Sequence, residues 1–440
     1  MRIVSFVFML LLATFSYASP LAAKPITYPD VQVVEAANGQ TAWVIEDHSL
    51  PIVTLKITFK ESGSAYDPDG KSGLATLVAE MLDEGAGPYD NQLFKKRLES
   101  LAMDLSAGAG KDNLSISVRT LKDQLGHALD MVKLAMLEPH FSEDALKRTR
   151  EEILLSLAKD KEDQDSIATL AWEDKMFGKH PYGHDSRGTA ESLAEITTQD
   201  LRHYTLEHFQ KGQMLISIVG DITTEEVRNI LDDTLVLPIN STLIHTNNVP
   251  SIEKFPENIE EHILFPTDQT VIVFGQKGIP YSDPDFYAAY ILNYVLGGGS
   301  FQSRLMSEIR ENRGLVYSVS TSLDFMQKAS IFRGYLATKK ESAGEALTLT
   351  KQITTYVKKA GITQEEMEAA KQYLMGSFPL RLATSNGLVQ TLDFMQRFDL
   401  GTNFLNQRNQ KIDAVSRTDI NRVAQSLLDP DNFVTVIVGR

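Results

Sequence analysis

The sequence predicts an α+β fold built from two homologous domains, and three observations lead to this prediction. Segments with strand-like alternation of apolar residues are mixed with segments whose apolar residues recur at helical spacing. The length of 440 residues suits two domains of roughly 200 residues each. The pattern also repeats at offsets of 218 to 221 residues, which indicates a duplication. The matching pairs are Ile196–Leu201 with Val415–Ile420, Leu215–Gly220 with Val434–Gly439, Ala128-Leu129 with Ala346-Leu347, and Ser142 with Thr363.

The first half begins with a predicted hairpin and continues with alternating element types. Asn38-Gly39 separates two strand-like runs within Val31–Glu46, a pattern typical of a tight β-turn. Ile52–Phe59 alternates like a half-buried strand, and Leu74–Leu82 places its apolar residues on one helix face. The further predicted elements are helices at Asn91–Leu101, Gln124–Leu137 and Ser142–Lys161, and strands at Leu114–Leu121 and Met214–Val219.

The second half contains a distinctive stretch at Leu296–Tyr317. Gly297-Gly298-Gly299 is a loop without Cβ atoms, which chain or ligand can approach closely. A helix is predicted from Phe301 to about Asn312, closed by Gly314, and a strand follows from Leu315. Arg310 at the helix end and Tyr317 on the strand can bring a guanidinium and a phenol hydroxyl to one place, where both can donate hydrogen bonds to a carbonyl or oxyanion.

Composition narrows the class of function. The formal charge is −15 without any basic block, which argues against binding to nucleic acid or to an anionic membrane. Residues 1–18 have a positive start, an apolar run and a small-x-small cleavage pattern, so we expect a signal peptide, with a later cut up to residue 23 as an alternative. No membrane span is expected after cleavage. The chain has no cysteine, which is compatible with a soluble protein of a bacterial periplasm.

Several motifs resemble the pitrilysin/insulinase-type metallopeptidases, which include the mitochondrial processing peptidase. They are the Asn38-Gly39 hairpin, Gly73-Leu74-Ala75, His180-Pro181-Tyr182-Gly183, Val219-Gly220-Asp221 and Leu296–Tyr317. The resemblance covers nearly the whole mature chain. It implies a two-lobed half-clamshell in which each domain is a mainly antiparallel sheet packed with helices. The expected boundaries are residues 26–238 and 259–440 for the domains, with a linker at 239–258.

The zinc motif of that family is missing. The family carries H-x-x-E-H after Gly-Leu-Ala, with two histidine ligands one helical turn apart and a glutamate that activates water. Here Thr76 and Glu80 stand at the ligand positions and Ala79 replaces the general base. The third ligand position is expected within residues 153–158, which hold no carboxylate, although Glu151 and Glu152 directly precede them. We therefore expect no metal and no other cofactor on this chain.

One pair of histidines has a spacing close to that of a zinc motif. His203 and His208 are five residues apart, so on a helix their side chains would point roughly 140° apart and could not chelate one ion from one face. The remaining histidines show no ligand spacing. His180 is expected to have a structural role.

The resemblance implies a division of labour between two chains. This chain is expected to be inactive alone and to serve a homologous H-x-x-E-H subunit, which would hold the zinc. Arg310 and Tyr317 would bind the scissile carbonyl of a peptide substrate, and Gly297, Gly298, Gly299 and Ser300 would line the substrate path. Three alternatives stay open: a peptide-binding pseudoenzyme without a peptidase partner, a purely structural subunit, and an active enzyme with a relocated metal.

Overall fold

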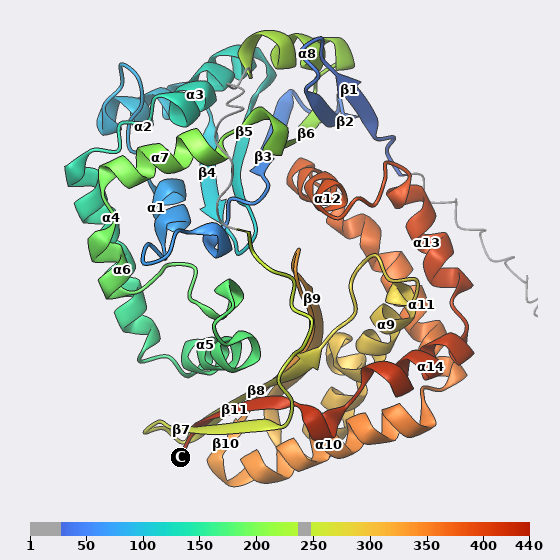
Figure 1. Cartoon of the computed structure of the whole chain (residues 1–440). Coiled ribbons are helices and arrows are strands. Elements are labelled where there is room, and N and C mark those ends of the chain that lie inside the picture. Colours follow the sequence, from blue (N-terminus) through green and yellow to red (C-terminus); the bar gives the residue numbers. More distant parts are fainter. Residues whose placement is uncertain (1–27, 236–247) are drawn as a thin grey trace, which may run out of the picture.

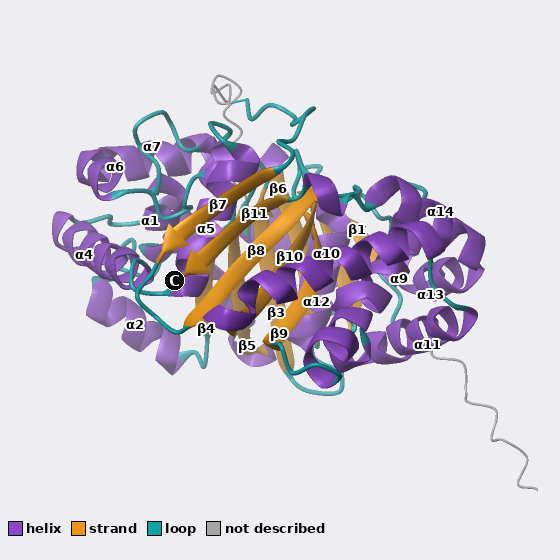
Figure 2. Cartoon of the chain, turned by 90° about the horizontal axis from the view of Figure 1, so that it is seen from below, coloured by secondary structure: helices purple, strands orange, loops and turns teal. Residues whose placement is uncertain are grey.

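The computed structural model describes residues 28–235 and 248–440, which form two β-sheets with their helices (Figure 1). Viewed from below, the strands lie at the centre and helices flank them on both sides (Figure 2). The first sheet contains β1 (Gln32–Glu35), β2 (Thr41–Glu46), β3 (Ile52–Phe59), β4 (Asp104–Ala109), β5 (Leu114–Leu121) and β6 (Met214–Gly220). The second sheet contains β7 (Ile259–Leu264), β8 (Gln269–Lys277), β9 (Val316–Phe325), β10 (Ser330–Lys339) and β11 (Val434–Gly439).

The two sheets share one topology. Their strand orders are β1-β2-β6-β3-β5-β4 and β7-β11-β8-β10-β9, so the second repeats the first without its edge strand β1. Each sheet has one parallel pair, β2 with β6 and β7 with β11, and all its other pairs are antiparallel. The predicted α+β fold of two homologous, mainly antiparallel domains is confirmed.

The helices divide between the two halves. In the first half they are α1 (Leu74–Glu80), α2 (Asn91–Ser100), α3 (Leu125–Leu137), α4 (Glu143–Asp160), α5 (Gln164–Phe177), α6 (Ala190–Glu195), α7 (Thr198–His208) and α8 (Thr224–Asn229). In the second half they are α9 (Phe286–Asn293), α10 (Ala343–Ala360), α11 (Gln364–Arg381), α12 (Ser385–Arg397), α13 (Phe404–Ala414) and α14 (Arg417–Leu427).

Two of the four repeated pairs of segments contain helix caps. Thr197 caps α7 and Ser416 caps α14, each in a reciprocal capping box with an aspartate three residues later. Ser142 caps α4 and Thr363 caps α11 through their side-chain oxygens. The offset seen in the sequence therefore records repeated backbone hydrogen bonding at the helix starts.

The predicted hairpin is present between β1 and β2. Gly39 has a φ of 79°, the left-handed conformation that glycine adopts without steric cost. Asn38 accepts a hydrogen bond from the backbone N–H of Gln40 at 2.8 Å, which stabilises the turn.

Each half places one helix on the sheet of the other half (Figure 1). Helix α5 packs on the second sheet, where the indole N–H of Trp172 donates to the Val434 carbonyl at 3.0 Å. Helix α12 packs on the first sheet, where Gln396 Nε2 donates to Ser217 Oγ at 2.8 Å. Because α12 covers its second face, β3 is buried on both sides, and the prediction of a half-buried strand is wrong.

A buried polar cluster joins α12 to β3. Asp393 is 2% exposed and accepts from Thr58 Oγ1 at 2.5 Å and from Arg397 Nε at 2.9 Å. Lys56 Nζ lies 3.4 Å from the Asp393 carboxylate and donates to Gln390 Oε1 at 2.6 Å. Burial lowers the pKa of Lys56, and the attraction of Asp393 offsets only part of that effect. Charged groups of both halves therefore meet in the protein interior.

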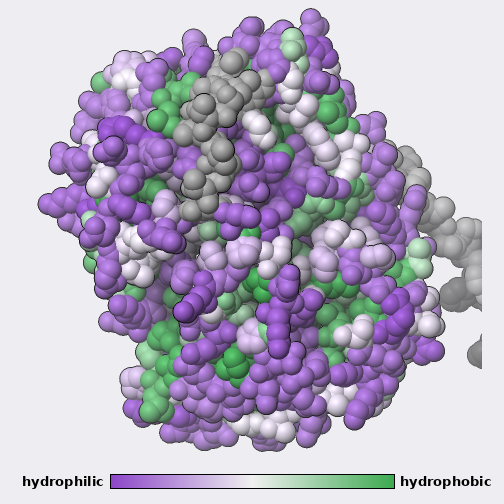
Figure 3. All heavy atoms as spheres, in the orientation of Figure 1, coloured by the Kyte–Doolittle hydropathy of each residue, from purple (hydrophilic) through white to green (hydrophobic). Residues whose placement is uncertain are grey.

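The expected signal peptide at residues 1–18 lies outside the described residues, as does the first part of the expected linker at 239–258. The rest of that segment packs against the protein: Val249 and Phe255 are buried with α5 and the second sheet. His180 Nε2 lies 2.9 Å from the Pro250 carbonyl, which supports its structural role. No helix among the described residues is long and apolar enough to span a membrane. The face in Figure 3 is mostly hydrophilic, with smaller hydrophobic areas between the polar side chains.

Candidate functional site

Helix α1, which carries the altered zinc motif, keeps the packing of an intact helix. Leu77 and Val78 are fully buried. Asp67 accepts from the backbone N–H groups of Gly73 and Ala75 at 2.8 and 2.9 Å, which satisfies unpaired donors at the start of the helix. Burial raises the pKa of Asp67 to about 7, although these hydrogen bonds favour its ionised form. Sequence reasoning missed this cap because Asp67 lies several residues before the helix, beyond the usual capping position.

The side chains at the motif positions do not form a zinc site. Thr76 Oγ1 donates to the Ser186 carbonyl at 2.7 Å and thus holds the loop before α6. Ala79 is buried and has no group that can move a proton. Loss of hydration raises the pKa of Glu80, with smaller contributions from the charges of Asp83 and Glu152.

The charge of Glu152 thus acts on Glu80. Glu152 directly precedes residues 153–158, where the third ligand position is expected, and that alignment stays a prediction. Two carboxylates without any histidine do not supply the donor set of a catalytic zinc site. Within residues 28–235 and 248–440 no group of three or more His, Cys, Asp and Glu side chains is arranged to hold a metal.

The histidine pair on α7 is divided between solvent and core. His203 is exposed and lies 3.8 Å from the Glu207 carboxylate. His208 is 4% exposed and packs against the ring of Tyr204 at 4.3 Å between centroids. One ion cannot be shared by side chains in these two positions.

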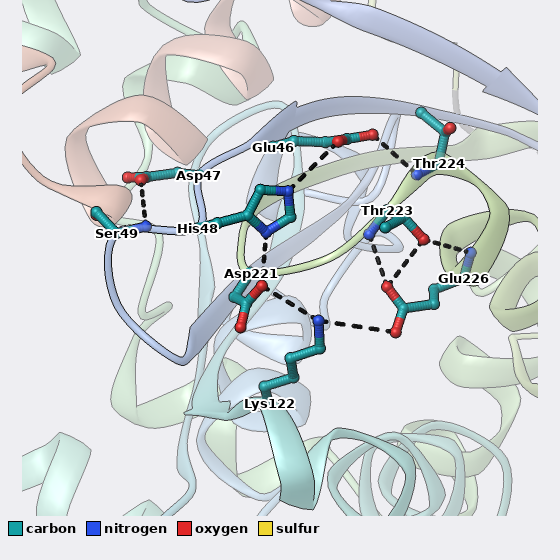
Figure 4. A network of polar contacts seen from close by, with 9 residues as sticks. All are labelled: Glu46, Asp47, His48, Ser49, Lys122, Asp221, Thr223, Thr224 and Glu226. Atoms are coloured by element: carbon teal, nitrogen blue, oxygen red, sulfur yellow. Dashed lines mark hydrogen bonds and ion pairs between the residues drawn. The ribbon is translucent and has the colours of Figure 1, made fainter.

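A further polar network surrounds His48 at the turn between β2 and β3 (Figure 4). His48 Nδ1 lies 2.6 Å from Asp221 Oδ1, and Nε2 lies 3.5 Å from Glu46 Oε2. Lys122 Nζ lies 3.1 Å from the same Asp221 oxygen and 3.9 Å from Glu226 Oε1. The hydrogen bond with Asp221 raises the pKa of His48. This network connects the ends of β2, β5 and β6 to the start of α8.

The glycine-rich loop follows α9 as a π-helical turn, Tyr294–Gly298. A Cβ on Gly297 would lie 2.5 Å from Thr321 Oγ1 on β9, and one on Gly299 would lie 2.7 Å from the Tyr294 carbonyl. Both glycines are buried, so contacts within the chain explain the absence of side chains there. Gly298 and Ser300 are exposed, and of the four predicted substrate-lining residues these two are accessible.

The predicted helix from Phe301 is split into two short pieces. Ser300–Gln302 forms a 3-10 turn and Met306–Glu311 is π-helical, with Asn312 N donating to the Ser307 carbonyl at 2.9 Å. The predicted closure at Gly314 is confirmed: its φ is 62°, its N–H bonds the Arg310 carbonyl, and the next N–H bonds the Ile309 carbonyl. These hydrogen bonds span four and six residues, so each is one residue wider than the corresponding bond of a Schellman motif, as expected after a π-helical turn.

Arg310 and Tyr317 stand on either side of this closure. The guanidinium carbon of Arg310 lies 4.9 Å from the centroid of the Phe301 ring. Tyr317, near the start of the edge strand β9, is 52% exposed. Within the described part of the chain no carboxylate lies within 4.0 Å of Arg310, and no hydrogen bond joins it to Tyr317. The structure thus leaves both groups available to a ligand, while their role in substrate binding stays a prediction.

The fold and this site define a relative of the zinc metallopeptidases that lacks the metal chemistry. Comparisons with known proteins identify the family. Residues 43–190 match the family model described as Insulinase (Peptidase family M16), and residues 195–374 match Peptidase M16 inactive domain. A crystal structure of a peptidase M16 inactive domain from Pseudomonas fluorescens superimposes with a TM-score of 0.85 at 30% identity, covering 93% of this chain and 98% of that one. The chain belongs to peptidase family M16.

Relatives at lower identity also match along most of the chain. A Helicobacter pylori protein named "Non-peptidase homolog YmxG" is 28% identical over 438 residues, covering 99% of this chain and 98% of the relative. A Bacillus subtilis protein named "Uncharacterized zinc protease YmxG" is 24% identical, covering 86% and 90%. The predicted family is confirmed, and α1 of this chain carries neither the histidine ligands nor the general base of the zinc motif.

Proposed function

We propose that this chain is the substrate-binding subunit of a heterodimeric zinc metallopeptidase in a bacterial periplasm. A homologous partner with an intact H-x-x-E-H motif would hold the zinc and the general base. This chain would supply Arg310 and Tyr317 across the interface, and the substrates would be peptides. The expected signal peptide supports export, and the absence of cysteine is compatible with it.

The observation that carries the proposal is the contrast between the two halves. Helix α1 keeps its buried face and its Asp67 cap, yet Thr76, Ala79 and Glu80 cannot bind and activate water on zinc. Arg310 and Tyr317 keep their donors without a carboxylate partner in the described structure. A chain that serves only as a scaffold has no need of such a pair on an exposed strand edge.

The geometry gives these two residues suitable chemistry. Packing on Phe301 orients the planar Arg310 guanidinium and leaves its N–H donors free of any competing anion. Tyr317 presents a phenol hydroxyl from the rigid frame of β9. Donors held in place before the reaction stabilise an oxyanion better than water does, and loss of one such donor typically lowers turnover by about 10²–10³-fold.

The test uses the complex of this chain with its partner. Arg310→Ala and Tyr317→Phe are each expected to lower peptide turnover by about 10²-fold or more, while the stability of the chain and its partner binding stay unchanged. Arg313→Ala is the matched control, because Arg313 lies on the same segment but is already paired with Glu308 at 2.6 Å. Unchanged turnover in both test variants would remove the assigned role.

The alternatives give different results in the same preparation. A peptide-binding pseudoenzyme would bind peptides but co-purify with no H-x-x-E-H subunit. A structural subunit would assemble with partners and tolerate both substitutions. An active enzyme with a relocated metal would carry stoichiometric zinc when isolated, and a chelator would abolish its activity.

A further inference from the structure

Two joined cavities lie in the second domain, between the end of β9 and helices α9, α11, α12 and α13. Their volumes are about 490 and 400 Å³, each within the range of small-ligand sites. We call them joined because six residues line both of them, which are Tyr290, Leu323, Phe325, Phe378, Arg381 and Arg408.

Aromatic rings form most of the wall of the larger cavity. Tyr281 stacks on Phe286 at 3.9 Å between centroids and meets the rings of Phe325 and Phe394 edge-on at 5.6 and 5.3 Å. Rings fixed in this way offer flat apolar surfaces and edges to a further apolar group. The wall is therefore suited to an aromatic or aliphatic side chain.

A buried cation faces this apolar space. Arg408 is 6% exposed, and its guanidinium carbon lies 4.1 Å from the Phe378 ring centroid and 5.8 Å from that of Tyr290. Its Nη1 donates to the Leu374 carbonyl and to Asn409 Oδ1 at 3.2 and 3.1 Å, both uncharged acceptors. No carboxylate among the described residues lies within 4.0 Å of it.

The positive charge at these cavities is not balanced by their walls. Arg381 and Arg408 are their charged lining residues, and no aspartate or glutamate lines either cavity in the described structure. Burying a charge without a counter-charge is costly, and ring faces offset that cost only in part. In a chain with a net charge of −15, a local excess of cations marks a place for an anionic group.

We infer that the joined cavities bind the C-terminal end of a peptide whose last residue is apolar or aromatic. The carboxylate pairs with Arg408, the last side chain lies among the rings, and Arg381 attracts the anion at the exposed rim. Arg408 is the buried one of the two lining arginines, and a carboxylate matches its single charge, whereas a phosphate would bring a second negative charge that only the exposed Arg381 could meet. Leu323 and Phe325 of the edge strand β9 also line the cavities, so free backbone groups border the path of the peptide.

Arg310 and Tyr317 line neither cavity, whereas Gly298, expected on the substrate path, lines the smaller one, and binding at this site requires no catalytic partner. Its test is calorimetric titration of the isolated mature chain with N-acetyl-L-phenylalanine and with the corresponding amide. The acid is expected to bind at least about 10-fold more tightly than the amide, because only the acid forms a charge-assisted hydrogen bond with Arg408. Equal affinities, or no binding of the acid, would overturn the assignment without touching the proposed function.

Variants locate the binding. Arg408→Gln is expected to abolish the preference for the acid. Arg381→Gln at the exposed rim is expected to lower the binding affinity for the acid about 3-fold or more, while the affinity for the amide stays the same. Arg417→Gln is the control, since Arg417 is exposed on α14 and lines neither cavity. If Arg408→Gln fails to fold, the affinities of the Arg381→Gln variant for the acid and the amide alone test the proposal. A preference for the acid that survives the substitutions, or tighter binding of phenyl phosphate than of the acid, would refute the proposal.

Discussion

Asp393 joins α12 to the first sheet within a buried polar cluster, and we expect Asp393→Asn to destabilise the whole chain. The substitution keeps the side-chain shape and removes the negative charge that faces Lys56 and Arg397. Breaking a buried ion pair by removing one partner typically costs about 3–5 kcal/mol, because the other charge stays buried without compensation.

The groups around Asp393 place the expected loss of unfolding free energy at the lower end of that range, about 3 kcal/mol. Lys56 keeps its hydrogen bond to Gln390 Oε1 at 2.6 Å, and its lowered pKa makes loss of its proton easier. Arg397 is 27% exposed and can turn toward water. Removing the second charge as well, in Lys56→Met with Asp393→Asn, is expected to recover most of the loss, since an apolar side chain needs no counter-charge.

Urea unfolding followed by tryptophan fluorescence and by far-ultraviolet circular dichroism measures these free energies. The two tryptophans lie on β2 and α5, so the signal covers both sheets, and one coincident transition is expected because the halves exchange helices. Asp285→Asn is the control: Asp285 pairs with Arg422 at 2.5 Å, but both are partly exposed, and its loss should cost less than about 1 kcal/mol. If Asp393→Asn costs no more than this control, the reasoning about the buried cluster is wrong.

Two further predictions concern the turn at His48 and the glycine-rich loop. Because the pKa of His48 is raised in the folded state, the contribution of His48 to stability is complete below about pH 6.5 and declines as the pH rises through the folded pKa. NMR titration of Asp221→Asn should show a lower pKa of His48 than in the unchanged chain. An unchanged pKa would contradict the assigned cause, the hydrogen bond with Asp221. Gly297→Ala should destabilise by about 1–3 kcal/mol through overpacking on Thr321. Gly344→Ala, in open space on α10, should stabilise the chain by about 0.5–1 kcal/mol. Equal effects of the two substitutions on thermal unfolding would refute the close approach of Gly297 to Thr321.

The sequence predicted features that depend on local hydrogen bonding and periodicity. The hairpin at Asn38-Gly39 and the Gly314 closure follow from short-range backbone preferences, and both are present. The burial of β3 on both faces could not be predicted, because the covering helix α12 lies more than 300 residues further along the chain. For the same reason, spacing alone did not reveal that the charge of Glu152 acts on Glu80, or that Arg408 lines a cavity walled by residues of five elements.

The exchange of α5 and α12 between the two halves limits how this chain can move in the proposed complex. Each sheet is covered by a helix of the other half, with Trp172 bonded to Val434 on one side and Asp393 held by Thr58 and Lys56 on the other. Separating the two halves would expose two apolar faces and a buried ion pair at once, so the chain should move as one rigid body. In the proposed complex, a peptide would then reach Arg310, Tyr317 and the partner's zinc only if the two subunits separate or rotate against each other. The proposed peptide site at Arg408 lies within this chain and would keep its geometry through that motion, so a peptide end bound there would stay held while the subunits separate.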